Sequence, residues 1–371
     1  MFVHTGDYVE HTSEDALRST YYTFTPRPLM TGNFHMMTDD IATLLADAHR
    51  ALGFLNGILS FTPNSELVAE LLLLQESCFS KMIDYSDFDI NSVFIERGKG
   101  KSNTDIKNIM SAYHYAISTT TPKLSYTSIY SHAIHENYPD RKLAVREKPL
   151  FLKQSTSNYR QYNPTAPHKI QSALIDISDY IKSSNTDALI KAAMCHYQFE
   201  MIHPYEIYNG IVGRILPYHI LYNSGLNEVL FFPLSTSLYR HKTEYFSKLE
   251  STQKNGNYTE WISFFVQMIK EAAQHGVEFI QYYDTLFKNG ENRVLARHQH
   301  RADHTLTVYQ YFIRNIASSI GHASEKLQLS FPTISRSVAI LQELGLLANI
   351  AGKARNRVFF HAGLLERLTS I

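Results

Sequence analysis

His203, Asn209, Gly210 and Arg214 lie within one short stretch that reads I-H-P-Y-E-I-Y-N-G-I-V-G-R. An unperturbed imidazole titrates near neutral pH, so His203 could take a proton from an attacking hydroxyl. Backbone amides around Asn209 and Gly210, at the start of a helix, could hold a phosphate, and Arg214 could grip it. The spacing indicates phosphoryl chemistry. A purely structural alternative is that His-Pro ends one helix and Asn-Gly turns into the next.

Two predicted helices position this loop. Apolar spacing predicts one over 187–202, which delivers His203, and one over 211–223, which Gly225 is placed to end. Similar spacing predicts helices over 39–59, 67–82, 105–117, 168–181, 239–249 and 261–275. Residues 1–35 lack such spacing and predict an extended arm, and the polar stretch 288–291 predicts a link.

The loop resembles the signature of the Fic family, H-x-F-x-(D/E)-G-N-G-R-x-x-R. His203, Pro204, Tyr205, Asn209, Gly210 and Arg214 fall in register with it. The flanking helices are similar too, so the resemblance runs from about residue 25 to the end. It implies transfer of AMP from ATP to a protein hydroxyl, with His203 as base and Asn209, Gly210, Gly213 and Arg214 binding the nucleotide phosphates.

Three positions depart from that signature. Ile207 replaces the acidic residue that, in the family, holds Mg²⁺, and it offers no oxygen ligand. Tyr208 replaces a glycine, and Ile211 replaces an arginine. Losing one such contact costs on the order of 2.7–4 kcal/mol of transition-state stabilisation. We therefore expect ATP as substrate, a metal ion without its usual ligand, and a weak or silent enzyme.

Two further segments resemble parts of the family. Ser80 and Asp84, in S-K-M-I-D-Y, resemble the inhibitory segment (S/T)-x-x-x-E-(G/N), which implies that Asp84 faces Arg214. The alternative is a polar stripe at a helix end. A hairpin predicted over 143–163 resembles the flap that aligns the target, which implies roles for Tyr159, Arg160 and Gln161. The alternative is a plain surface hairpin.

The last part of the chain predicts a separate basic unit. Helices over 305–316, 323–327 and 332–344, then strands over 346–350 and 357–360, describe a winged helix-turn-helix. The second helix of the helix-turn-helix is the one over 332–344, and its residues expected to contact DNA are Thr333, Ser335, Arg336 and Ser337. On the wing, the expected contacts are Lys353, Arg355 and Arg357. Such units also serve as protein-docking modules, and that alternative stays open.

The distribution of charged residues, cysteines and apolar runs limits the classes of partner and location that the sequence allows. The formal net charge is zero, but from Arg293 onward ten Lys/Arg face four Asp/Glu, which favours an anionic partner such as DNA for this segment. Cys78 and Cys195 lie in apolar helical patterns, so we expect neither a disulfide nor a metal site from them. No apolar run could span a membrane, which predicts a cytoplasmic protein without membrane contact.

The sequence therefore predicts an all-α Fic fold with a small β-hairpin flap and a terminal winged helix-turn-helix. We expect an N-terminal arm and helical segment over 1–100, a Fic-like domain over 101–287 and the winged unit over 295–371. The leading hypothesis is a protein adenylyltransferase with impaired chemistry. The alternative is a silent, DNA-binding regulator, and a third is an inactive protein that docks a true enzyme or its target. A homodimer also stays open.

Overall fold

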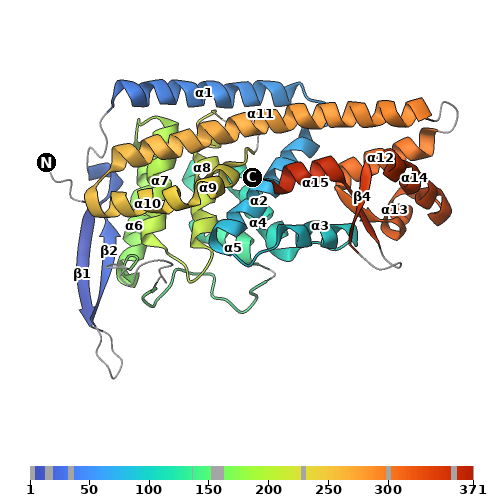
Figure 1. The fold of residues 1–371 in the computed structure, drawn as a ribbon. Helices are drawn as coiled ribbons and strands as arrows, with labels where there is room; N and C mark the ends of the chain where they lie inside the picture. The colour runs from blue at the N-terminus through green and yellow to red at the C-terminus, as the bar shows by residue number, and fades with distance from the viewer. Residues whose placement is uncertain are drawn as a thin grey trace.

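Helices make up most of the computed structural model, which describes residues 5–12, 20–31, 37–135, 137–151, 163–226, 231–297, 302–351 and 357–370. The expected all-α fold is confirmed (Figure 1). The helices are α1 (Asp39–Ser60), α2 (Ser65–Asp84), α3 (Ile90–Gly98), α4 (Thr104–Ser118), α5 (Tyr126–Ile134), α6 (Pro167–Ser183), α7 (Ala188–Ile202), α8 (Asn209–Asn223), α9 (Leu234–Arg240), α10 (Lys242–Asn255), α11 (Tyr258–Arg297), α12 (Ala302–Asn315), α13 (Ile320–Leu327), α14 (Phe331–Glu343) and α15 (Ala362–Thr369). The strands are β1 (Gly6–Thr12), β2 (Thr20–Pro26), β3 (Ala317–Ser319), β4 (Leu347–Ala351) and β5 (Val358–His361).

The bundle around the loop has α2, α4, α7 and α8 at its centre, and both helices that flank the loop are buried along nearly their whole length. The predicted helices over 67–82, 105–117, 168–181, 187–202 and 211–223 are present with ends shifted by a few residues. The predicted helix over 239–249 is instead shared between α9 and α10. Helices α3 and α5 were not predicted.

A single long helix, α11, runs beside α1 and continues to the far end of the molecule (Figure 1). The predicted link over 288–291 is therefore wrong, because these residues lie inside α11. Gly290 shows why a glycine stands there: a Cβ at this position would lie 1.9 Å from the Tyr309 hydroxyl oxygen. That hydroxyl donates a hydrogen bond of 2.9 Å to the carbonyl oxygen of Leu286, which fastens α12 to α11.

The N-terminal segment is more regular than predicted. Strands β1 and β2 pair antiparallel, from Gly6 opposite Pro26 to Thr12 opposite Thr20. Phe24 is fully buried, and its amide donates to the carbonyl oxygen of Asn163 at 2.8 Å. The predicted extended arm is thus a pair of strands that packs on the body through β2. In the described residues 143–151, part of the predicted flap, no strand forms.

The terminal segment consists of α12–α14, the three-stranded antiparallel sheet β3-β5-β4 and α15. The three expected helices are α12, α13 and α14, and the two expected strands are β4 and β5, whereas β3 and α15 were not predicted. The assignment as a winged helix-turn-helix and the domain boundaries stay predictions. Ile334, Val338 and Leu341 of α14 are buried as expected. The prediction that Ser337 is exposed is wrong, because this residue is buried against α12.

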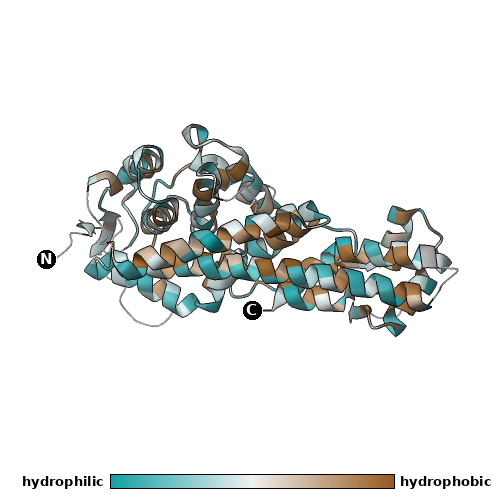
Figure 2. Cartoon of the chain, turned by 90° about the horizontal axis from the view of Figure 1, so that it is seen from above, coloured by the Kyte–Doolittle hydropathy of each residue, from teal (hydrophilic) through white to brown (hydrophobic). Residues whose placement is uncertain are grey.

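Helix α15, which was not predicted, returns to the body. The Gln75 side chain on α2 donates to the carbonyl oxygen of Arg367 at 3.2 Å, and Arg367 pairs with Glu278 of α11 at 3.0 Å. Figure 2 shows hydrophilic and hydrophobic residues mixed along the long helices, as expected for helices that bury one face. In the described part of the chain, every helix is too short or too polar to cross a bilayer.

The close approach at Gly290 gives a direct test of the continuous helix. We expect Gly290→Ala to destabilise the protein by roughly 1–3 kcal/mol, because its Cβ would overlap the Tyr309 hydroxyl. Urea unfolding would measure the change. The matched control is Gly53→Ala in α1, where a Cβ meets no atom within 4 Å, and which should be neutral or stabilise by roughly 0.5–1 kcal/mol. Full tolerance of Gly290→Ala would favour a link at 288–291.

Candidate functional site

His203 lies directly after the last residue of α7, with a left-handed backbone (φ 44°). Its Nδ1 donates to the carbonyl oxygen of Glu200, so in the neutral ring Nε2 is the nitrogen that can accept a proton. The Glu200 carboxylate lies 3.9 Å from Nδ1 and is itself 8% exposed. The imidazole is therefore oriented by its own helix, in the tautomer that a general base at Nε2 requires.

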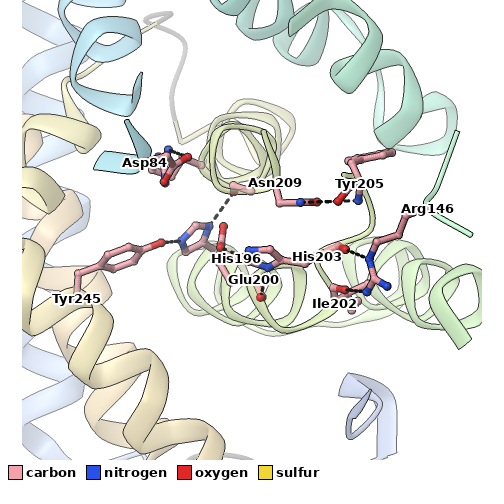
Figure 3. A network of polar contacts seen from close by, with 11 residues as sticks. Asp84, Arg146, His196, Glu200, Ile202, His203, Tyr205, Asn209 and Tyr245 are labelled. Carbon is pink, nitrogen blue, oxygen red and sulfur yellow. Dashed lines mark hydrogen bonds and ion pairs between the residues drawn. The ribbon is translucent and has the colours of Figure 1, made fainter. Parts of the chain in front are cut away.

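Arg146 holds the backbone around His203, and sequence reasoning missed it. Its guanidinium donates to the carbonyl oxygens of His203 at 2.7 Å, Lys148 at 3.1 Å and Ile202 at 3.2 Å, and also to that of Thr165. The backbone N–H of Arg146 donates to the carbonyl oxygen of Pro204 at 2.8 Å. Burial lowers the pKa of Arg146 to about 10, which leaves it charged at neutral pH. Figure 3 shows this side chain pointing at the backbone of Ile202 and His203.

Asn209 closes the loop with both ends of its amide. Its Oδ1 accepts from the Tyr205 amide at 2.8 Å, and its Nδ2 donates to the Tyr205 carbonyl at 2.8 Å (Figure 3). The Tyr205 ring stacks on Tyr130 of α5 with centroids 4.0 Å apart. The predicted phosphate-binding role of Asn209 therefore rests on its backbone, since its side chain is engaged within the loop.

Tyr208, at the position of the signature's glycine, caps α8 with a left-handed backbone (φ 64°). Such a conformation is costly for a bulky residue and persists where neighbours hold it. Here Lys81 donates to the Tyr208 hydroxyl at 2.6 Å, and that hydroxyl donates to Asp105 at 2.9 Å. Lys81 also pairs with Asp105 at 3.0 Å. Burial, together with the Asp105 charge, raises the pKa of Tyr208. The ring is thus fixed against α2 and α4.

Arg214 and Asp84 meet, as the resemblance implied. Nη2 of Arg214 lies 2.8 Å from Oδ2 of Asp84, and Nη1 lies 3.3 Å from Oδ1, which is a bidentate pair. Ser80 accepts from Nε at 2.9 Å through its hydroxyl and from Nη2 at 2.7 Å through its carbonyl. Burial opposes the charge on Arg214, but Asp84 outweighs it, so the pKa of Arg214 is raised. The Arg214 side chain is 1% exposed, whereas that of Asp84 is 24% exposed.

Gly210 marks where an anion would meet α8. A Cβ added there would lie 2.6 Å and 2.8 Å from the two carboxylate oxygens of Asp84. The Asp84 carboxylate therefore lies over the first turn of α8, where backbone amides and the helix dipole favour negative charge. Gly213 faces the other way: a Cβ there would lie 2.3 Å from Oε1 of Glu200. Its position suits close packing of α7 on α8.

The three departing positions contain no carboxylate for a cation. Ile207 packs against the core, Ile211 is fully buried, and the neighbouring Glu206 is exposed and paired with Arg141. Among the described residues, no cluster of three His, Cys, Asp or Glu side chains could hold a metal ion. The residues present do not fit the Mg²⁺ site that the family implies.

His196 joins α7, α8 and α10 beneath the loop. Its Nδ1 donates to the carbonyl oxygen of Gly213 at 2.8 Å, and its Nε2 accepts from the Tyr245 hydroxyl at 2.8 Å (Figure 3). Burial lowers the pKa of His196 to about 3, so the ring is neutral. This network fixes the spacing of the helices that carry His203 and Arg214, and sequence reasoning missed it.

Of the residues predicted for DNA contact, Thr333, Ser335, Arg336 and Ser337 lie on α14, and Arg357 directly precedes β5. Arg336 and Arg357 are exposed, while Thr333 and Ser335 are half-buried, and Thr333 lies 2.8 Å from the α14 cap Ser330 between hydroxyl oxygens. Lys353 and Arg355 lie outside the described residues. The same holds for Tyr159, Arg160 and Gln161 of the predicted flap.

Comparison with known proteins covers the same region. Residues 125–221, which include α5–α7, the whole loop and most of α8, match the model of the Fic/DOC family. Protein adenylyltransferase fic-1 of Caenorhabditis elegans is 25% identical over 138 residues, which are 36% of this chain and 24% of that protein. A probable protein adenylyltransferase of Aquifex aeolicus is 30% identical over 95 residues, 25% of this chain and 27% of that protein. The chain thus matches about a quarter of the length of these relatives.

A solved structure extends the likeness beyond that region. A Fic family protein from Desulfovibrio desulfuricans G20 superposes with a TM-score of 0.58 at 15% identity, over 90% of this chain and 98% of that one. At this identity the likeness concerns the fold.

The buried histidines predict how stability depends on pH. Burial lowers the pKa of His196 to about 3, of His275 and His361 to about 4, and also that of His219. In the unfolded chain these histidines take up a proton near pH 6.5, whereas in the folded chain they do so at lower pH. The free energy of unfolding is therefore highest above pH 6.5 and falls as the pH drops, by up to about 1.4 kcal/mol per pH unit for each histidine.

Urea unfolding between pH 7.5 and pH 4.5 would measure this slope. His196→Asn should destabilise the protein but flatten its pH dependence, because one of the groups that must take up a proton is gone. His168→Asn, at an exposed position, should leave the slope unchanged. Equal slopes in all three proteins would contradict a neutral, buried His196.

Proposed function

This chain is a Fic family protein, and from that premise we propose that it transfers AMP from ATP to a hydroxyl group of a protein, at a low rate. The relatives that match the same region are named protein adenylyltransferases. The single observation that carries the proposal is the arrangement at α8, where His203 precedes the helix and Arg214 and Gly210 lie at its start.

The proposed reaction uses the chain's own groups. The target hydroxyl oxygen attacks the α-phosphorus of ATP, and its proton passes to Nε2 of His203. The bond from that phosphorus to the bridging oxygen breaks, and pyrophosphate leaves. Amides at the start of α8 and the Arg214 guanidinium would balance charge on the departing phosphates. No step is assigned to a metal ion, because positions 207 and 211 are isoleucines and the described residues contain no group of three His, Cys, Asp or Glu side chains that could hold one.

Asp84 supplies the restraint in this proposal. Its carboxylate lies over Gly210 and is bonded to both terminal nitrogens of Arg214, so a nucleotide phosphate would have to displace it. A phosphate bound to the same two nitrogens of Arg214 would lie against the Asp84 carboxylate, and two negative charges in contact repel each other strongly. The outer phosphates of ATP would therefore bind productively once Asp84 has moved or has been replaced.

The departures at Ile207 and Ile211 support a slow reaction. Ile211 leaves Arg214 as the one arginine of the loop, and each lost contact to the developing charge costs on the order of 2.7–4 kcal/mol. We expect Tyr208 to lower the rate of AMP transfer less than Ile207 and Ile211 do. Lys81 and Asp105 bind its hydroxyl and thereby fix the ring on α2 and α4.

Transfer of label from ATP carrying radioactive α-phosphate tests the proposal. We expect weak labelling of the protein itself or of an added extract with the wild type in Mg²⁺ buffer, and about tenfold or more with Asp84→Gly, since removing the carboxylate vacates the anion position. Asp84→Gly combined with His203→Ala should give no label.

The matched control is Asp87→Gly, an exposed aspartate in the turn after α2, which should label as weakly as the wild type. Absence of label in both wild type and Asp84→Gly, with both proteins folded, would rule out the enzymatic reading. Label that persists after His203→Ala would rule out His203 as the base.

A second proposal concerns the terminal segment: that it is a winged helix-turn-helix and binds DNA, whether or not the loop is catalytic. In its favour, Arg336 is exposed on α14, the second helix of the expected pair, and the segment from Arg293 carries ten Lys/Arg against four Asp/Glu. Phosphate contacts from such residues would supply binding without sequence preference.

A mobility shift with mixed-sequence duplex DNA tests this second function. At about 50 mM salt we expect a shift that weakens steeply as salt rises, because bound cations are released from the phosphates. Arg336→Ala should weaken it several-fold. Arg50→Ala, on the exposed side of α1, should leave it unchanged. Lack of any shift at low salt would exclude DNA as the partner.

A further inference from the structure

A cavity of about 420 Å³ lies between α2, α3 and α4, apart from the loop at His203. Four apolar side chains, four basic ones and three small polar ones line it: Leu74, Val93, Arg97, Lys101, Ser102, Asn103, Ile106, Lys107, Met110, Ser111 and His114. All of these residues are described, and none of them is an aspartate or glutamate. The volume is that of sites that hold small organic molecules.

Arg97 is the most informative group in this cavity. Its side chain makes no hydrogen bond or ion pair with another described residue, although it is half-buried on α3. Burial lowers the pKa of Arg97, and the Glu70 carboxylate opposes this shift. A guanidinium held out of bulk water without an acceptor is unfavourable, and a bidentate oxyanion is the partner that its planar fork fits best.

The nearby carboxylates are engaged elsewhere. Glu70 pairs with His114 at 3.1 Å, and Glu96 accepts from the Asn103 side chain at 3.0 Å. Asp105 pairs with Lys81. The positive charge of Arg97 and Lys101 therefore lies at a cavity whose lining contains no aspartate or glutamate to balance it.

Four of the lining side chains are apolar. Leu74, Val93 and Ile106 are each less than 5% exposed, and Met110 packs against the same core. These side chains would contribute to binding a ligand by removing apolar surface from water, which an inorganic anion does not provide.

We propose that this cavity is a binding site for a small organic anion that carries an apolar or aromatic body, with its carboxylate, sulfonate or phosphate on Arg97 and its body on Leu74, Val93 and Ile106. The site is independent of the proposed AMP transfer, because it shares no residue with the loop at His203. It borders the terminal segment, since α3 packs on β3 and β5 and a Cβ at Gly98 would lie 2.2 Å from Val358.

Titration calorimetry of the full-length protein with naphthalene-1-sulfonate tests the proposal, because this probe combines an aromatic body with one oxyanion. We expect saturable binding at one site per chain. Sodium sulfate and the neutral naphthalene-1-methanol should each bind at least about tenfold more weakly, since each lacks one half of the recognition.

Two variants place the probe in the cavity. Arg97→Gln should weaken binding about tenfold or more, while Arg50→Gln on α1, the matched control, should bind as the wild type does. Met110→Trp should block binding by filling the cavity with Arg97 still present, so it decides the matter if Arg97→Gln fails to fold. His203→Ala should bind normally.

Several results would overturn the proposal. These are no saturable binding of naphthalene-1-sulfonate, unchanged binding in folded Arg97→Gln or Met110→Trp, and sulfate binding as tightly as the aromatic probe. The last would reduce the site to a simple anion contact. Absence of AMP transfer with normal probe binding would contradict only the proposed function. Normal AMP transfer without probe binding would contradict only the proposed anion site.

Discussion

The buried ion pair between Arg214 and Asp84 is the interaction on which the site depends. A guanidinium at 1% exposure requires full compensation, and Asp84 with Ser80 supplies it from the end of α2. The pair joins α2 to α8 and at the same time brings a carboxylate over Gly210. In the proposed function, structure and restraint come from the same contact, because the carboxylate that stabilises Arg214 lies at the position proposed for a nucleotide phosphate.

The loop keeps its shape through residues outside the signature. Both His203 and Tyr208 have left-handed backbones, which are unfavourable unless neighbours hold them. Arg146 binds the carbonyls around His203, and Lys81 with Asp105 binds the Tyr208 hydroxyl. Because these supports do not depend on positions 207 and 211, the loop can retain its path while the carboxylate and arginine expected there are absent.

The sequence predicted what depends on local spacing and on resemblance. The helices around the loop follow from apolar periodicity, and the meeting of Ser80 and Asp84 with Arg214 follows from the resemblance. Arg146 could not be found in this way, because its partners are backbone carbonyls at 148, 165, 202 and 203, which no side-chain pattern encodes. Arg146 lies inside the predicted hairpin over 143–163, with Arg141, Lys142 and Lys148 nearby, so nothing in the sequence set it apart from its basic neighbours.

Other errors have identifiable causes. Asn289-Gly290 indicated a turn, but the glycine is required by the approach of Tyr309, a tertiary contact that overrides local preference. The β1–β2 hairpin was hidden by Pro26 and Pro28, which end the second strand rather than prevent it. Ser337 seemed exposed because its residue type is polar, yet it lies on the face of α14 that packs on α12.

Calorimetric titration of ATP into the wild type and into Asp84→Ala tests the central claim most directly, since it reports the anion position without requiring catalysis. If the Asp84 carboxylate occupies the place of a phosphate, ATP should bind about tenfold or more tightly to the variant. Equal or weaker binding of ATP to a folded Asp84→Ala protein would contradict the account.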